Sequence, residues 1–284
     1  MATTTLRSFS SLVSTQELAS SLDNKKTKVL DASWHMPNTN RDPYQEFLAN
    51  HIPGARFFGI DTIKDTSVDL PHMLPSAAAF ADSVVYDSVG AFSAARVYWT
   101  FKAFGHNQVS ILNGGLPAWI QQGLPLSRDN DNGDNTKATY QAKLNPRLVR
   151  DYPTVLQNCQ RYQQGDDDVA QILDARALAR FTGEAPEPRA GLSSGHMPGS
   201  ICVPFQEVAT QDGYYKDEKA LYALFESKGV DLNRPIIASC GSGITASVLY
   251  FALERAGAKD ISVYDGSWTE YADKKDSIII KDLQ

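Results

Sequence analysis

The sequence has few cysteines, few histidines and no long hydrophobic run. Three cysteines occur in 284 residues, Cys159, Cys202 and Cys240, and none lies in a CxxC pair. An odd number of cysteines without a CxxC pair is not typical of a disulfide framework. We therefore expect a compartment that keeps thiols reduced, the mitochondrion or the cytoplasm. The five histidines show no metal-ligand spacing, so no metal and no other cofactor is expected. No stretch approaches the roughly 18 apolar residues of a membrane helix, so no membrane partner is expected.

Positive charge is also scarce. The chain has 27 Lys and Arg against 33 Asp and Glu, a net charge of −6, which argues against nucleic acid as a partner. A hydrophobic content of 42% with 21% charged residues predicts a buried core rather than disorder. The N-terminal segment MATTTLRSFSSLVS is rich in Ser and Thr and has no acid before Glu17. It is compatible with a short mitochondrial transit peptide or with a frayed tail before the first helix.

The chain contains an internal repeat, and this repeat predicts its architecture. Four blocks of the first half recur in the second: VLDASW with ILDARA, HIPGA with HMPGS, VVYDSVG with IIASCGS, and VSILNGGLPAW with ISVYDGSWTEY. The last two pairs share one spacing of 152 residues. We therefore predict an N-terminal domain over 1–129, a polar linker over 130–150 and a C-terminal domain over 151–284.

Each half alternates short apolar runs with segments of helical spacing. Strands are expected at 29–30, 84–86, 109–112, 171–173, 236–239 and 261–264, and helices at 94–104 and 244–256. This order predicts an α/β fold in which each half is a parallel sheet flanked by helices. In such a fold, ligands bind at the carboxyl ends of the strands.

The segment around Cys240 carries the strongest indication of chemistry. An apolar strand ends at Cys240, the residues Gly241, Ser242 and Gly243 form a tight loop, and Thr245 leads into an amphipathic helix. Loop amides and a helix N-terminus that point at the sulfur stabilise negative charge there, so we predict a nucleophilic thiolate. The alternative is a buried, inert cysteine, and this is the role we expect for the other two cysteines.

Two neighbouring observations narrow the chemistry. Cysteine phosphatases need an arginine at the end of such a loop to bind phosphate, but here Ala246 follows Thr245. A phosphatase is therefore disfavoured. In the first half, Ser88 stands where the second half has Cys240, so we expect the N-terminal domain to be catalytically inactive.

The tandem repeat, DAR…GHMPGS, the CGSGIT loop at 240–245 and YDGSW together resemble the two-domain rhodanese family. The loop is similar to the 3-mercaptopyruvate sulfurtransferase branch. The branch that prefers thiosulfate typically has two basic residues where this chain has Gly241 and Ser242. The difference has a physical reason, because thiosulfate is a dianion whereas mercaptopyruvate carries one carboxylate.

The resemblance also implies a set of substrate-binding residues. In RFTGEAPEPRAG it implies that Arg180, with Arg189 beside it, binds the substrate carboxylate through bidentate hydrogen bonds. The other reading is a solvated loop whose arginines neutralise Glu184 and Glu187. The expected substrate-binding loop residues are Gly241, Gly243, Ile244 and Thr245.

A second group lies in the first half. The resemblance implies that Asp61 and His72 cooperate with Ser242 across the domain cleft, in a relay that donates to the substrate carbonyl or moves its proton. A structural role for His72 in the stiff LPHMLP loop is the alternative. The chain between His51 and Val84 is about a dozen residues shorter than the resemblance implies, which predicts a less stable N-terminal domain.

These observations predict a sulfurtransferase. Cys240 would take sulfur from 3-mercaptopyruvate as a persulfide, release pyruvate, and pass the sulfur to a thiol acceptor or a thioredoxin-like reductant. The alternatives are a thiosulfate sulfurtransferase and a sulfur-relay protein that delivers persulfide to a partner, for example in tRNA thiolation. A monomer is favoured.

Overall fold

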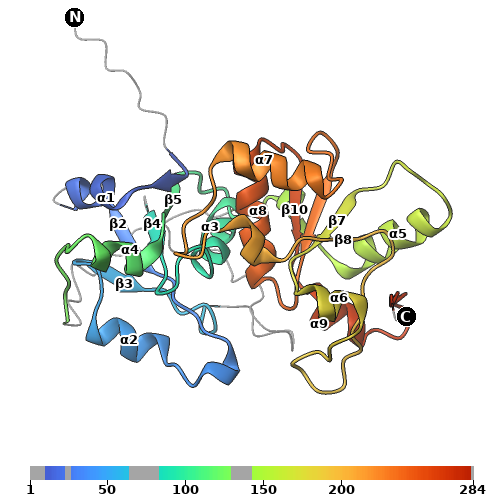
Figure 1. Ribbon diagram of the computed structural model, residues 1–284, viewed down its shortest axis with the longest axis horizontal. Helices are drawn as coiled ribbons and strands as arrows, with labels where there is room; N and C mark the ends of the chain where they lie inside the picture. The colour runs from blue at the N-terminus through green and yellow to red at the C-terminus, as the bar shows by residue number, and fades with distance from the viewer. Residues whose placement is uncertain (1–9, 23–26, 64–82, 129–142, 283–284) are drawn as a thin grey trace, which may run out of the picture.

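Two five-stranded parallel sheets, each flanked by helices, lie side by side along the longest axis of the molecule (Figure 1). The computed structural model describes residues 10–22, 27–63, 83–128 and 143–282. The two sheets have the same topology, β1-β5-β4-β2-β3 and β6-β10-β9-β7-β8. This arrangement confirms the predicted tandem α/β fold.

The first sheet is built from the N-terminal half. Its strands are β1 (Leu12–Val13), β2 (Lys28–Asp31), β3 (Ala55–Phe57), β4 (Ser83–Tyr86) and β5 (Val109–Leu112). Its helices are α1 (Thr15–Ser21), α2 (Pro43–Ala49), α3 (Ala94–Ala103) and α4 (Gly115–Gln121), with a 3-10 turn η1 at Pro37–Thr39. His51 bonds the Phe47 carbonyl through Nδ1 at 2.8 Å, which fixes the turn after α2.

The second sheet is built from the C-terminal half. Its strands are β6 (Val149–Arg150), β7 (Gln171–Asp174), β8 (Ile201–Cys202), β9 (Ile236–Ser239) and β10 (Ile261–Tyr264). Its helices are α5 (Tyr152–Gln163), α6 (Leu178–Thr182), α7 (Glu218–Ser227), α8 (Ile244–Ala256) and α9 (Ser267–Asp273), with 3-10 turns η2 (Pro146–Leu148) and η3 (Phe205–Val208). His196 bonds the Phe181 carbonyl at 3.0 Å, in the role that His51 has in the first half.

The apolar runs of the sequence became the central strands for a simple reason. All four residues of β5, β9 and β10 are buried, as expected of parallel strands that are covered on both faces. The predicted helix over 244–256 is present with those bounds, and the one predicted over 94–104 ends one residue earlier.

The end of the predicted linker belongs to both halves. Val149 and Arg150 form β6, which pairs in parallel with β10 of the second sheet. Just before it, the amides of Lys143 and Asn145 donate to the carbonyls at the end of α3, at 3.4 and 2.7 Å. This part of the chain therefore joins the two halves closely.

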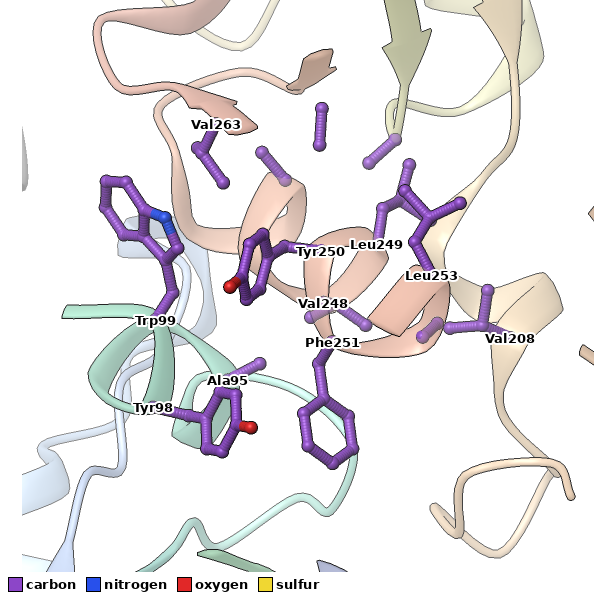
Figure 2. Close-up of a cluster of buried hydrophobic side chains, with 14 of the residues drawn as sticks. Ala95, Tyr98, Trp99, Val208, Val248, Leu249, Tyr250, Phe251, Leu253 and Val263 are labelled. Carbon is purple, nitrogen blue, oxygen red and sulfur yellow. The ribbon is translucent and has the colours of Figure 1, made fainter. Parts of the chain in front are cut away.

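The two helices α3 and α8 pack against each other between the sheets, and their side chains form a core shared by both halves (Figure 2). Nine residues of each helix are buried. Tyr98 of α3 meets Phe251 of α8 edge-on, with ring centroids 4.9 Å apart, and its hydroxyl donates to Glu254 at 2.6 Å. No helix in the described part of the chain is long and apolar enough to cross a membrane.

Candidate active site

Cys240 follows β9 directly, at the carboxyl edge of the second sheet, with only 2% of the residue exposed. The amide of Gly243 donates to Cys240 Sγ at 3.1 Å. The helix α8 starts at the next residue, so its N-terminal end lies beside the sulfur. A backbone donor and a helix N-terminus at this position both favour a negative charge on sulfur.

The local sequence explains the loop. Gly243 has φ +86°, a conformation that L side chains rarely adopt, and it turns the chain from the strand into α8. Gly241 and Ser242 are half-buried between Cys240 and this turn. Ile244 is buried, and Thr245 is half-buried in the first turn of α8.

The first residues of α9 form hydrogen bonds with the backbone of the cysteine loop. The Cys240 amide donates to Ser267 Oγ at 3.3 Å, and the Trp268 amide donates to the Cys240 carbonyl at 2.9 Å. Thr269 donates to the Gly241 carbonyl from its amide and from its hydroxyl, at 3.0 and 2.7 Å. The YDGSW motif of the sequence therefore fixes the backbone of the cysteine loop, a role that the motif alone did not disclose.

Arg180 lies against the first glycine of this loop. A Cβ added at Gly241 would lie 3.4 Å from Arg180 Nη2. Arg180 donates from Nε and Nη2 to Glu187, whose side chain is only 3% exposed. Arg176 binds the same carboxylate at 2.7 Å, and its guanidinium stacks on the Trp268 ring at 4.0 Å.

The remaining predicted residues lie in different places. Arg189 is exposed, two residues beyond Glu187. Asp61 is exposed, and its carboxylate accepts a hydrogen bond from Trp34 Nε1 at 2.9 Å. His72 and the shortened segment before Val84 fall in 64–82, outside the described residues.

The other two cysteines are poor nucleophiles. Burial raises the pKa of the Cys159 thiol to about 11. Burial also raises the pKa of Cys202 to about 12, with the negative charge of Asp174 acting in the same direction. Both thiols therefore stay protonated near neutral pH, which leaves Cys240 as the candidate nucleophile.

In the first half, the loop that matches the cysteine loop has its backbone amides bonded to a carboxylate. The Asp87 carboxylate accepts from the amides of Val89, Gly90 and Ala94 at 3.0, 2.6 and 2.8 Å. These amides surround the loop in which Ser88 replaces the cysteine. A buried carboxylate therefore takes the donors that an anionic ligand would use in this half.

In the described ranges, no group of three or more His, Cys, Asp or Glu side chains could hold a metal ion. Among the described residues, the site brings together the Cys240 thiol, backbone amides and the Arg180 guanidinium. Such an arrangement can stabilise a thiolate and bind a small anionic substrate next to it.

Comparison with known proteins agrees with this geometry. The family model of the rhodanese-like domain matches this sequence twice, over residues 14–122 and 159–274. The chain is 41% identical to rat 3-mercaptopyruvate sulfurtransferase, over 93% of this chain and 92% of the rat protein. It is also 41% identical to rat thiosulfate sulfurtransferase, with the same shares covered.

A solved structure shows the same similarity. The sulfur transferase subunit found sub-stoichiometrically in yeast mitochondrial complex I superposes with a TM-score of 0.86 at 38% identity, over 96% of this chain and 100% of that one. The two matched domains, the shared fold and these relatives lead to one conclusion: the chain belongs to the rhodanese family and is an enzyme that transfers sulfur-containing groups.

Proposed function

We propose that this enzyme takes sulfur from 3-mercaptopyruvate through a persulfide on Cys240. The Cys240 thiolate attacks the sulfur of the donor, so that a sulfur–sulfur bond forms and the carbon–sulfur bond breaks. The electron pair of the broken bond goes to the enolate of pyruvate, which takes a proton and leaves. A thiol acceptor then attacks the outer sulfur, carries it away and restores the Cys240 thiolate.

The observation that carries this proposal is the contact between the Gly243 amide and Cys240 Sγ at 3.1 Å. The donor and the adjacent N-terminal end of α8 favour the thiolate before the reaction. They also favour the persulfide anion after it, since its charge lies on the neighbouring sulfur. The glycines at 241 and 243 carry no side chain that would compete with the added atom.

The loop composition supports mercaptopyruvate as the donor. Gly241 and Ser242 are uncharged, and Arg180 is the cation beside them. One guanidinium matches one carboxylate, whereas a dianion gains more from additional cations. We assign substrate binding to Arg180, with Arg189 and the loop residues Gly241, Gly243, Ile244 and Thr245 in supporting roles.

Proton transfer to the pyruvate enolate needs a donor. We assign this step to Ser242, which lies in the cysteine loop, acting with Asp61 and His72 of the first half. The nucleophile then belongs to the C-terminal domain over 151–284. The N-terminal domain over 1–129 supplies side chains to the cleft and has no nucleophile of its own.

Thiosulfate as the donor is the second candidate, because a relative named for that activity is as similar as the one named for mercaptopyruvate. The acceptor is proposed to be a small thiol or a thioredoxin-like reductant, in the mitochondrion or the cytoplasm, with the enzyme acting as a monomer. A relay to a protein partner, as in tRNA thiolation, would replace only this last step.

Intact-mass measurement after exposure to each donor tests the proposal. Mercaptopyruvate should add one sulfur atom to the protein, located on the Cys240 peptide and removed by dithiothreitol, with one equivalent of pyruvate released. Faster sulfur uptake from thiosulfate than from mercaptopyruvate would favour the second candidate. A sulfur adduct on Cys159 or Cys202 would contradict the assignment of the nucleophile.

A further inference from the structure

A charged side chain of the N-terminal half is buried against the cysteine loop of the C-terminal half. Arg96, on α3, forms an ion pair with Asp265, the residue that follows β10, with Nη1 and Oδ1 2.6 Å apart. The two side chains are only 2% and 4% exposed. Such a pair is enclosed by both halves and is not screened as a surface pair would be.

This ion pair encloses the glycine that donates to the sulfur. A Cβ added at Gly243 would lie 2.8 Å from Arg96 Nη1, 3.0 Å from the Asp265 carbonyl and 3.3 Å from Asp265 Oδ1. Arg96 Nη1 also reaches the Gly243 carbonyl at 3.5 Å, and Ser247 Oγ donates to that carbonyl at 2.9 Å. The backbone on both sides of the Gly243 Cα is therefore held, by Cys240 at one end and by Arg96 with Ser247 at the other.

Arg96 is itself fixed by its own helix. Its guanidinium lies over the Trp99 ring at 4.7 Å, and Trp99 Nε1 donates to the Leu148 carbonyl at 3.2 Å. The position of the guanidinium is therefore supported by Trp99, which is bonded to η2 (Pro146–Leu148).

We infer that Arg96 is a positioning residue through which the N-terminal half controls the reactivity of Cys240. It keeps the Gly243 amide aimed at the sulfur, and it balances the Asp265 carboxylate that lies against the same glycine. This inference rests on the proposed role of Cys240 as the nucleophile. It gives the half without a cysteine an indirect part in the chemistry, in addition to the roles proposed above for Asp61 and His72.

The two partners have opposite effects on charge, and this separates the inference from a merely structural role. Arg96→Met removes the positive charge that pairs with the Asp265 carboxylate, so the negative charge of this carboxylate opposes the thiolate more strongly. Asp265→Asn retains an oxygen that accepts from Arg96 but removes the negative charge, so the arginine then favours the thiolate. Arg180 of α6 lies against Gly241, and it is unchanged in both variants.

The rate of Cys240 alkylation by iodoacetamide measures this directly, followed by peptide mass spectrometry from about pH 5 to pH 9. Below the plateau of the pH profile, Arg96→Met should react about tenfold more slowly than the wild type. This factor corresponds to a shift of about one pH unit in the midpoint of the profile. Asp265→Asn should react about threefold faster at the same pH. Sulfur uptake from mercaptopyruvate should follow the same order.

Lys102→Met is the matched control. Lys102 also lies on α3 and pairs across the same interface, with Glu254 of α8 at 3.4 Å, but this pair lies at the other end of α3 from Arg96. In this variant, the rate of Cys240 alkylation should stay within about twofold of the wild type, because a partly exposed ion pair contributes little interaction energy. Melting temperatures of all variants record the stability lost at the interface.

Three results would overturn the inference: alkylation of Arg96→Met within twofold of the wild type, equal slowing in Lys102→Met, or alkylation of Asp265→Asn at or below the wild-type rate. If Arg96→Met fails to fold, Asp265→Asn still decides. Alkylation needs no sulfur donor, so a wild type that takes up no sulfur from either donor would refute the proposed function and leave this test intact.

Discussion

Arg180, whose side chain is 22% exposed, forms an ion pair with the buried Glu187 carboxylate beside the cysteine loop, and Arg176 binds the same carboxylate. The Arg180 guanidinium is therefore set in place before any substrate arrives. A fixed cation loses less conformational entropy when it binds a carboxylate than a mobile one does. This fixed position favours Arg180 over the exposed Arg189 as the substrate-binding arginine of the proposed function.

Arg180→Ala should lower kcat/KM for mercaptopyruvate by about ten- to a hundredfold, because charge-assisted hydrogen bonds contribute about 1.5–3 kcal/mol each. Arg189→Ala should change it by less than about threefold, as expected for an exposed charge. Steady-state kinetics of both variants check this, with melting temperatures as the control for folding. Equal losses in the two variants would contradict the assignment.

Cys240→Ser should reduce sulfur transfer to background while the fold survives, since an alcohol cannot form a persulfide. Cys202→Ser should retain near wild-type activity, because its thiol, with a pKa of about 12, takes no part. Pyruvate release and intact mass measure both variants. Loss of activity in Cys202→Ser with an unchanged melting temperature would show that a second thiol is needed.

The donor preference depends on the charge of the loop. Gly241→Arg combined with Ser242→Lys should shift the ratio of kcat/KM towards thiosulfate by about tenfold or more, because each well-placed cation adds a charge-assisted hydrogen bond. A side chain at 241 would meet Arg180 Nη2 at 3.4 Å, so the new cation joins the existing one. An unchanged ratio of the two donors would mean that the loop does not distinguish them by charge.

The shared core makes a prediction about stability. Phe251 of α8 is fully buried and contacts Tyr98 of the first half and Tyr215 of the second, with ring centroids 4.9 and 4.7 Å away. Phe251→Ala should lower the free energy of unfolding by about 3–5 kcal/mol. Denaturation followed by circular dichroism should still show one transition, and two separated transitions would mean that the halves unfold independently.

The fold was predictable because its information is local and repeated. Apolar runs such as those at 109–112 and 236–239 become buried parallel strands in any context that covers both sheet faces. The strand–loop–helix geometry around Cys240 was predictable for the same reason, since these three segments are contiguous in the chain. The sequence did not predict four short strands, because two or three residues carry no periodicity: Leu12–Val13, Ala55–Phe57, Val149–Arg150 and Ile201–Cys202.

The residues that support the site were not predictable in this way. Arg96 and Asp265 are 169 residues apart, and the residues around each of them give no indication that the two form an ion pair. In the sequence, Glu187 reads only as a charge that arginines on a solvated loop neutralise. The structure shows that it is buried, which turns a surface pair into a fixed part of the site.

The loop of the first half allows a final test, in which a thiol is introduced at position 88 by Ser88→Cys in the Cys240→Ser background. This variant should take up no sulfur, because Asp87 already occupies the amides of Val89, Gly90 and Ala94. A carboxylate beside the new thiol also opposes its ionisation. Adding Asp87→Ser, which copies the Ser239–Cys240 pair of the second half, should free those amides and raise iodoacetamide alkylation at position 88 by about tenfold. Sulfur uptake at position 88 with Asp87 intact would show that the cysteine alone, and not the filled loop, separates the inactive half from the active one.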